Sequence, residues 1–247
     1  MAKFIISNLG ANDGTIYIEA GIRCHQTITL LYVDDDIIVG ARYLLDSGSV
    51  YVPRRYAVGP SFIKALSTVR KEFHIELSSD GIVAVASNLK IKAANAHSMF
   101  PNWWRMLDDS DEMGLATFNT EELVEALEYH KRESVVELRW KDIRGEEDER
   151  SPVVVRGVHW KKSGKYNILL ASEVDMYSEH RSVVLEVPLK PLLKLVRSFK
   201  SAGIEEIAFV FQRADFLRVD GITEVYGNDY LGIIRLNKSP VYGKIGK

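Results

Sequence analysis

Apolar residues recur at helical spacing in three segments of the chain and predict three helices. In the last of them, Leu192, Val196 and Phe199 repeat at intervals of three or four residues and therefore share one face. Asn119, with Glu122 three positions later, forms the sequence of a capping box, so a helix is expected to begin directly after Asn119. The predicted helices cover Ser61–Glu72, Thr120–Glu133 and Leu189–Ser201.

Most of the remaining chain consists of short apolar and β-branched runs separated by turn residues, which is typical of antiparallel strands. In the first half these runs lie at 3–7, 15–22, 27–33, 37–45, 50–52, 74–77, 82–86 and 90–94. In the second half they lie at 135–140, 153–160, 167–171, 183–187, 204–211, 216–219, 222–226 and 230–236. Because few helices interrupt many strands, the pattern predicts an α+β fold.

The middle of the chain is expected to join two domains. Phe100–Trp104 is aromatic and contains one proline, Asp108–Glu112 is a polar turn, and a new helix begins after Asn119. A chain of 247 residues is long enough for two domains of about 120 residues each. The predicted domains are residues 1–113 and 114–247.

A similar order of features in the two halves indicates an internal repeat. Val52-Pro53 and Val187-Pro188 each precede a predicted helix that carries cations on its outer face. A repeat of about half the chain length indicates two similar modules rather than a solenoid. The alternative is that an α+β chain contains such matches by coincidence.

Composition narrows the classes of function. The formal net charge of −2 gives no global attraction to nucleic acid or anionic lipid, so any polyanion site must come from local clustering. The single cysteine, Cys24, excludes an internal disulfide and a cysteine-based metal cluster. An early polar N-terminus and the lack of an apolar run of about 18 residues predict no signal peptide, no membrane span and a cytoplasmic protein.

One acidic motif resembles a catalytic metal site. Tyr32-Val33-Asp34-Asp35, at a predicted hairpin tip, is similar to the metal-binding hairpin of reverse transcriptases, where paired carboxylates hold Mg²⁺. Too few residues precede it for the additional upstream aspartate of that site. The histidines lack metal-ligand spacing, and no glycine-rich phosphate loop or nucleophile elbow is found. The sequence therefore favours a protein that is not an enzyme, without catalytic residues, bound metal or cofactor.

Cations gather on the outer faces of two predicted helices. Lys190, Lys194 and Arg197 lie at i, i+4 and i+7, so they point in the same direction. Phosphate contacts from such a strip bind DNA without reading its sequence. The alternative is that these side chains simply solvate exposed helices. The candidate DNA-binding residues are Lys64, Arg70, Lys71, Lys131, Arg132, Lys190, Lys194, Arg197 and Lys200.

Four segments together resemble the bacterial β sliding clamp family, the rings that tether replicative polymerases to DNA. Phe100–Leu107 is similar to a connector at a domain junction of that family, and Phe118–Leu127 is similar to the helix start that follows it. Val153–Val158 resembles the first strand after that helix, and Val187–Leu193 resembles a later step from strand to helix. The order and spacing agree over roughly residues 50–236.

The resemblance implies two α+β clamp-like domains, with antiparallel sheets outside and a few helices on one face. In the family, helices line a ring around duplex DNA, and a DNA polymerase and clamp loader dock short peptides in an apolar pocket near the connector. Because family rings contain six domains, a two-domain processivity factor is expected to form a homotrimer and to need no cofactor. The residues assigned to the pocket are Pro101, Trp103, Met106, Leu192, Ile233 and Ile234.

Two departures from the family pattern leave other functions open. Residues 8–22 read as turn and strand where a first helix is expected. The helix after Asn119 is acidic in its early part, at Glu121, Glu122, Glu125 and Glu128. The alternative function is an accessory or interaction module of clamp ancestry that does not encircle DNA. A metal-dependent nucleic-acid enzyme built on Asp34-Asp35-Asp36 is the third hypothesis.

Overall fold

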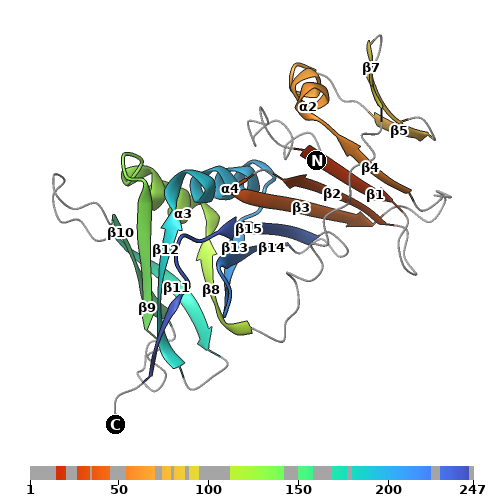
Figure 1. The fold of residues 1–247 in the computed structure, drawn as a ribbon. Helices are drawn as coiled ribbons and strands as arrows, with labels where there is room; N and C mark the ends of the chain where they lie inside the picture. The colour runs from red at the N-terminus through yellow and green to blue at the C-terminus, as the bar shows by residue number, and fades with distance from the viewer. Residues whose placement is uncertain are drawn as a thin grey trace.

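The computed structural model is built mainly of antiparallel strands, with three helices among the residues that it describes (Figure 1). The described residues are 15–20, 27–33, 35–44, 54–69, 74–78, 81–86, 89–94, 112–141, 150–157, 168–176, 180–223 and 229–244. The predicted α+β class is confirmed, since antiparallel sheets carry a few helices on one face. None of the described helices has the length and apolar content that crossing a membrane requires.

The elements follow the order of apolar runs in the sequence. The strands of the first half are β1 (Thr15–Ala20), β2 (Thr27–Val33), β3 (Ile37–Leu44), β4 (Arg54–Val58), β5 (His74–Ser78), β6 (Gly81–Ala86) and β7 (Leu89–Ala94). Those of the second half are β8 (Glu112–Asn119), β9 (Val135–Lys141), β10 (Arg150–Gly157), β11 (Ile168–Met176), β12 (His180–Pro188), β13 (Glu206–Gln212), β14 (Phe216–Ile222), β15 (Asp229–Arg235) and β16 (Val241–Lys244). The helices are α2 (Pro60–Ser67), α3 (Thr120–Tyr129) and α4 (Leu189–Ser201).

One sheet of 13 strands passes through both halves of the chain, in the order β16-β12-β9-β10-β11-β8-β13-β14-β15-β3-β2-β1-β4. A second sheet contains β5, β6 and β7. The two halves meet where β15 pairs antiparallel with β3, with Ile233 opposite Ile38 and Ile234 opposite Ile37. The backbone N–H of Arg235 extends this pairing by donating to the carbonyl oxygen of Asp36 at 3.2 Å. Main-chain hydrogen bonds therefore connect segments that are far apart in the sequence.

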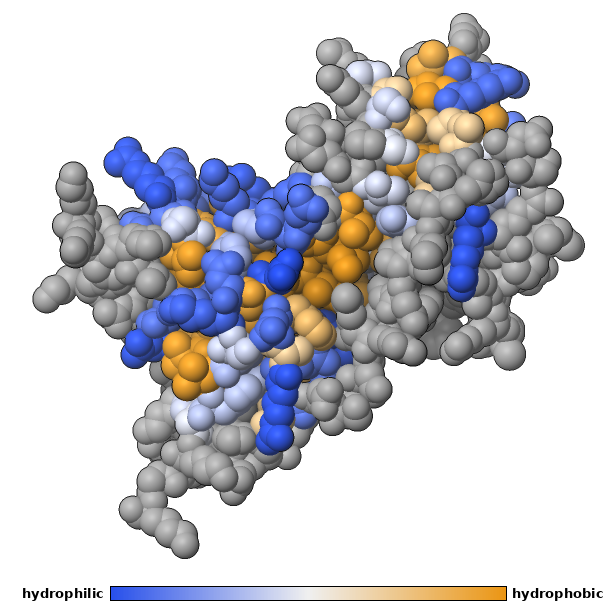
Figure 2. Space-filling model, viewed as in Figure 1, coloured by the Kyte–Doolittle hydropathy of each residue, from blue (hydrophilic) through white to orange (hydrophobic). Residues whose placement is uncertain are grey.

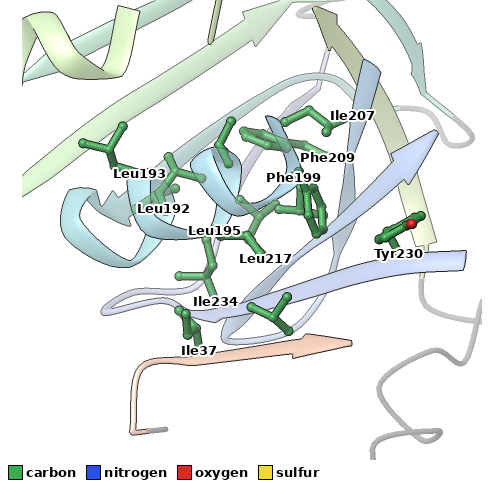
Figure 3. Packing of buried hydrophobic residues seen from close by; sticks show 14 of the residues in the cluster. Ile37, Leu192, Leu193, Leu195, Phe199, Ile207, Phe209, Leu217, Tyr230 and Ile234 are labelled. Carbon is green, nitrogen blue, oxygen red and sulfur yellow. The ribbon is translucent and has the colours of Figure 1, made fainter. Parts of the chain in front are cut away.

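Helix α4 packs over this junction. It contacts β12, β9 and β15 from its own half and β3 from the other half. Figure 3 shows Leu192, Leu195 and Phe199 of α4 among the buried residues of the sheet, near Ile37 and Ile234. The helix has the predicted bounds, and its predicted inner face is buried. Its periodic apolar face thus gains burial from both halves at once.

Helix α3 begins where the sequence predicts. The Asn119 side-chain oxygen accepts hydrogen bonds from the backbone N–H groups of Glu121 at 3.0 Å and Glu122 at 3.1 Å. These two amides have no partner within the first turn of a helix, so the cap stabilises the start. The helix ends at Tyr129, before the predicted Glu133, because the chain turns at His130 and the N–H of Glu133 donates to the carbonyl of His130 at 2.8 Å.

Aromatic pairs show how the long sheet curves around its core. Phe118 and Phe209 pack with ring centroids 4.8 Å apart on the neighbouring strands β8 and β13. Trp140 and Phe211 meet edge to face at 4.1 Å, although β9 and β13 are not neighbours in the sheet. The sheet therefore bends until these two strands face each other, and the apolar side chains between them form the core.

Some expectations from the sequence are corrected by the structure. The first strand after α3 is β9, so Val153–Val158 is not that strand and belongs in part to β10. Helix α2 follows β4 through Gly59 and Pro60, so the counterpart of the Pro188 step lies there rather than at Val52-Pro53. Helix α2 also ends at Ser67, earlier than predicted. The connector Phe100–Leu107 lies outside the described residues.

Gly232 permits the close approach of α4 to β15. A Cβ at this position would lie 2.4 Å from Cδ2 and 2.9 Å from Cγ of Leu195, which is fully buried, so this side chain would have to shift within the core. We expect Gly232→Ala to lower the free energy of unfolding by about 1–3 kcal/mol, measured by urea denaturation. In a Leu195→Ala background, Gly232→Ala should lower the free energy of unfolding by far less. An equal decrease in both backgrounds would contradict this explanation.

Candidate functional site

The exposed sides of α3 and α4 form a layer of paired charges, which we call the helix layer. The Lys200 ammonium contacts the Glu121 carboxylate at 2.8 Å. The Arg197 guanidinium donates to one oxygen of Glu128 from Nε at 3.2 Å and from Nη2 at 2.8 Å. Figure 2 shows hydrophilic side chains gathered where α3 and α4 lie in Figure 1. Arg197 and Lys200 therefore face carboxylates of the neighbouring helix as well as solvent.

These contacts shift the protonation of the glutamates in the helix layer. The hydrogen bond from Arg197 lowers the pKa of Glu128 below its ordinary value, and the hydrogen bond and charge of Lys200 lower the pKa of Glu121. Both carboxylates are exposed to solvent, so salt screens these interactions strongly.

Lys194 contacts the other half of the chain. Its Nζ donates to the Tyr32 hydroxyl at 3.2 Å and lies 4.8 Å from the centroid of the Tyr32 ring. Tyr32 belongs to β2, and its side chain is buried at 2% exposure. The contact combines a hydrogen bond with a cation–π interaction, so Lys194 helps to hold α4 against the first half.

The other predicted DNA-binding residues lie at several places. Lys190 is exposed at the start of α4, and Lys131 and Arg132 are exposed in the turn after α3. Lys64 lies in α2, while Arg70 and Lys71 lie outside the described residues. Among the described residues, Arg197 and Lys200 of α4 pair with Glu128 and Glu121 of α3, so carboxylates interrupt a purely positive strip.

The structure describes three of the six residues that are predicted to line a peptide pocket. Leu192 and Ile234 are fully buried in the main core. Ile233 lies on the opposite face of β15, with Leu31 and Leu231 in a second cluster, because successive residues of a strand point to opposite faces. Pro101, Trp103 and Met106 lie outside the described residues.

A pocket of about 300 Å³ opens where β2, β3, β14 and β15 meet, and we call it the junction pocket. Val33 lies opposite Ile38, and Ile38 lies opposite Ile233, so these three side chains form a row across three strands. Half-buried Phe216 of β14 lies beside this row. The lining residues are Val33, Asp35, Asp36, Ile37, Ile38, Asp215, Phe216, Ile233 and Arg235.

Backbone and side-chain hydrogen bonds fix the rim of the junction pocket. The N–H of Leu236 donates to the carbonyl oxygen of Asp215 at 2.8 Å, and the Ser239 hydroxyl donates to the Asp215 carboxylate. The N–H of Arg235 donates to the carbonyl oxygen of Asp36. The turn before β14 and the tip between β2 and β3 are thus both tied to the end of β15.

Sequence reasoning found only part of this pocket. It singled out the acidic hairpin Asp34–Asp36 as a turn and assigned Ile233 to a pocket. It missed Ile38, Phe216 and Arg235, which come from segments far apart in the sequence. The alternation of outward positions along each strand carries a signal for one face, but which strands become neighbours is decided by tertiary pairing.

The acidic hairpin does not assemble a described metal site. Asp35 and Asp36 are exposed, and Asp34 lies outside the described residues. Among the residues with described positions, no group of three or more His, Cys, Asp or Glu side chains is placed to hold a metal ion.

The long antiparallel sheet with helices on one face defines the fold of a DNA sliding clamp. The chain is similar to the DNA polymerase III beta chain from Streptococcus pneumoniae, with a TM-score of 0.71 and 15% identity over 96% of this chain and 62% of that one. It is also similar to the beta subunit from Pseudomonas aeruginosa, with a TM-score of 0.67 and 12% identity over 92% of this chain and 58% of that one.

A third similar structure is the beta subunit from Thermotoga maritima, with a TM-score of 0.69 and 11% identity over 96% of this chain and 63% of that one. The chain thus spans about three fifths of the length of these proteins. No protein-family model matches the chain, and no curated protein matches its sequence. At these low identities the similarity establishes the clamp fold.

The ion pair between Arg197 and Glu128 predicts a measurable titration. The pKa of Glu128 lies below its ordinary value of 4.5, so the stability from this pair is present above that value and lost as the pH falls through the lowered pKa. We expect Arg197→Gln to raise the Glu128 pKa toward 4.5 in a carboxyl-detected NMR titration. Lys190→Gln is the matched control on α4 and should leave it unchanged. A Glu128 pKa that does not respond to Arg197→Gln would show that the pair is absent in solution.

Proposed function

We propose that the chain is a DNA sliding clamp-like processivity factor, which encircles duplex DNA and tethers a DNA polymerase or other replication proteins to it. The observation that carries the proposal is the clamp fold, which extends over 92% or more of the chain. The similar proteins are beta subunits of DNA polymerase III. The function requires topology and binding rather than catalysis or a cofactor, and a clamp acts where DNA is copied, in the cytoplasm.

The proposed assembly is a homotrimer. The proposal follows from the two clamp-like domains that are expected in the chain and the six domains of a family ring. Domains at 1–113 and 114–247 would give six domains in a ring of three chains. The start of β8 at Glu112 supports this division, because β8 leads directly into α3 at the start of the second module.

The proposed DNA contacts come from cations near the helix layer. Lys190, Lys131 and Arg132 are exposed. Arg197 and Lys200 can contact phosphate only in competition with Glu128 and Glu121. Weak, sequence-independent phosphate contacts of this kind suit a protein that holds DNA by enclosure and slides along it.

The junction pocket is the proposed docking site for short peptides of a polymerase or clamp loader. Its floor is an apolar row on the face of the sheet that carries no helix, so a docked peptide would not obstruct DNA beside the helices. Apolar clefts with a few polar groups at their edges are the usual form of such binding sites.

A second candidate function is an interaction module of clamp ancestry that does not encircle DNA. The charge of the helix layer favours it, because α3 exposes four glutamates, and Glu121, Glu125 and Glu128 lie near the cations of α4. Repulsion between these glutamates and phosphates would weaken DNA binding at this surface. Such a module would use the junction pocket as a monomer or dimer.

The mass in solution distinguishes the two candidates. We expect light scattering after size-exclusion chromatography to give the mass of three 27.9 kDa chains at micromolar concentration, since a ring needs six domains. Dilution should lower the mass in a single step if closure is cooperative. A strict monomer at the same concentration would overturn the ring and support the interaction module.

Charge reversal tests the DNA contacts. We expect Lys190→Glu combined with Lys131→Glu to weaken association with a duplex at low salt by on the order of tenfold and to reduce its salt dependence, because counterion release scales with the number of phosphate contacts. Lys90→Glu combined with Lys92→Glu, which reverses two exposed lysines in β7, changes the net charge by the same amount and is the control. If the double variant and the control bind DNA like the unmodified protein, these lysines do not contact phosphates.

A further inference from the structure

The floor of the junction pocket is suited to one or two apolar side chains. Val33, Ile38 and Ile233 form a continuous row because each lies directly opposite the next on neighbouring strands. On β14, Arg218 lies directly opposite Ile233 at one end of the row, and half-buried Phe216 lies opposite Arg235, diagonal to Ile233. Branched aliphatic groups beside an aromatic ring offer burial to an incoming apolar residue without supplying a hydrogen-bond partner at the floor.

The rim of the junction pocket has the opposite character. Carboxylates approach from two sides, with Asp35 and Asp36 at the tip between β2 and β3 and Asp215 in the turn before β14. All three are exposed, and Arg235 is the one cation among the lining residues. The rim therefore has a formal excess of negative charge around an apolar floor.

A nearby arginine does not offset this charge. Arg218 follows Phe216 by two positions and so lies on the same face of β14. Its guanidinium donates to Glu112 at 2.8 Å and, through Nη2, to Asp220 at 2.7 Å. Since two carboxylates already engage Arg218, the surface beside the pocket is also acidic on balance.

We propose that the junction pocket selects a partner segment with an apolar anchor flanked by lysine or arginine; this rests on the proposed function, in which the pocket docks peptides. The anchor lies on the row of Val33, Ile38 and Ile233, and the flanking cations face Asp35 and Asp215. Acidic segments are rejected by repulsion between like charges, so the rim determines which partners dock. The same charge keeps nucleic acid away from the pocket, on the face opposite the helix layer.

The test uses three synthetic decapeptides that share a central Ile-Leu pair. The two residues on each side of this pair are all lysine in the first peptide, all serine in the second and all glutamate in the third. Binding of each labelled peptide to the full chain is followed by fluorescence polarisation in low salt. We expect the lysine peptide to bind about fivefold or more tighter than the serine peptide, as two exposed ion pairs would give, and the glutamate peptide to bind weakest. The preference for lysine should fade in about 1 M salt, where the screening length is about 3 Å.

Variants separate the charge at the rim from the apolar floor. Asp35→Asn with Asp215→Asn should abolish the preference for lysine and leave binding of the serine peptide unchanged. Glu125 is an exposed residue of α3 that does not line the pocket. Glu125→Gln therefore removes one negative charge elsewhere on the surface and should preserve the preference for the lysine peptide. Phe216→Ala should weaken the binding of all three peptides. If circular dichroism shows that the Phe216→Ala variant is unfolded, Ile38→Ala replaces it in this test.

The outcomes distinguish this proposal from the function on which it rests. If the lysine and serine peptides bind equally, selection by charge is overturned. If their binding is also weaker in Phe216→Ala or Ile38→Ala, the same result still supports peptide docking in the pocket. Binding of no peptide would overturn both. Lysine-peptide binding that persists in folded floor variants would place the attraction elsewhere on the surface and overturn the proposal for this pocket.

Discussion

The pairing of β15 with β3 is the interaction on which the rest of the molecule depends. It joins the two halves of the chain in one sheet through main-chain hydrogen bonds, and α4 packs over the joint because Gly232 leaves room for Leu195. The register is strongly specified. A slip by one residue would turn Ile37 and Ile234 out of the core and bring Ile38 and Ile233 into it.

The same pairing creates both the core and the junction pocket. Ile37 and Ile234 face α4, while the adjacent Ile38 and Ile233 face the surface without helices. The same pair of strands therefore supplies residues both to the core and to the pocket floor. The floor of the pocket is therefore built on paired strands of the sheet. Its acidic rim lies on turns, where side chains can vary without disturbing the packing, and this arrangement separates the requirement for folding from the determinant of partner choice.

The helix layer shows how neighbouring elements change the meaning of a charged residue. Amphipathic α3 and α4 bury their apolar faces and leave their charged faces in solvent. Because the two helices lie side by side, Glu121 and Glu128 contact Lys200 and Arg197, and a strip that looks purely cationic on α4 becomes a surface of mixed charge. Any DNA held by this surface is bound through few phosphate contacts, and this favours weak binding.

By itself, the sequence determined the α+β class, the strand-rich pattern, the start of α3 at its Asn119 cap and the bounds and buried face of α4, and it carried the resemblance to sliding clamps. These properties depend on local periodicity and capping, which the chain records residue by residue. Tertiary structure alone decided that Leu192 and Ile234 are core residues, that Lys194 contacts Tyr32, and that residues of four strands form an acidic-rimmed pocket. Periodicity gives each strand and helix its faces, but the partner of each face is set by long-range pairing and burial that no short segment contains.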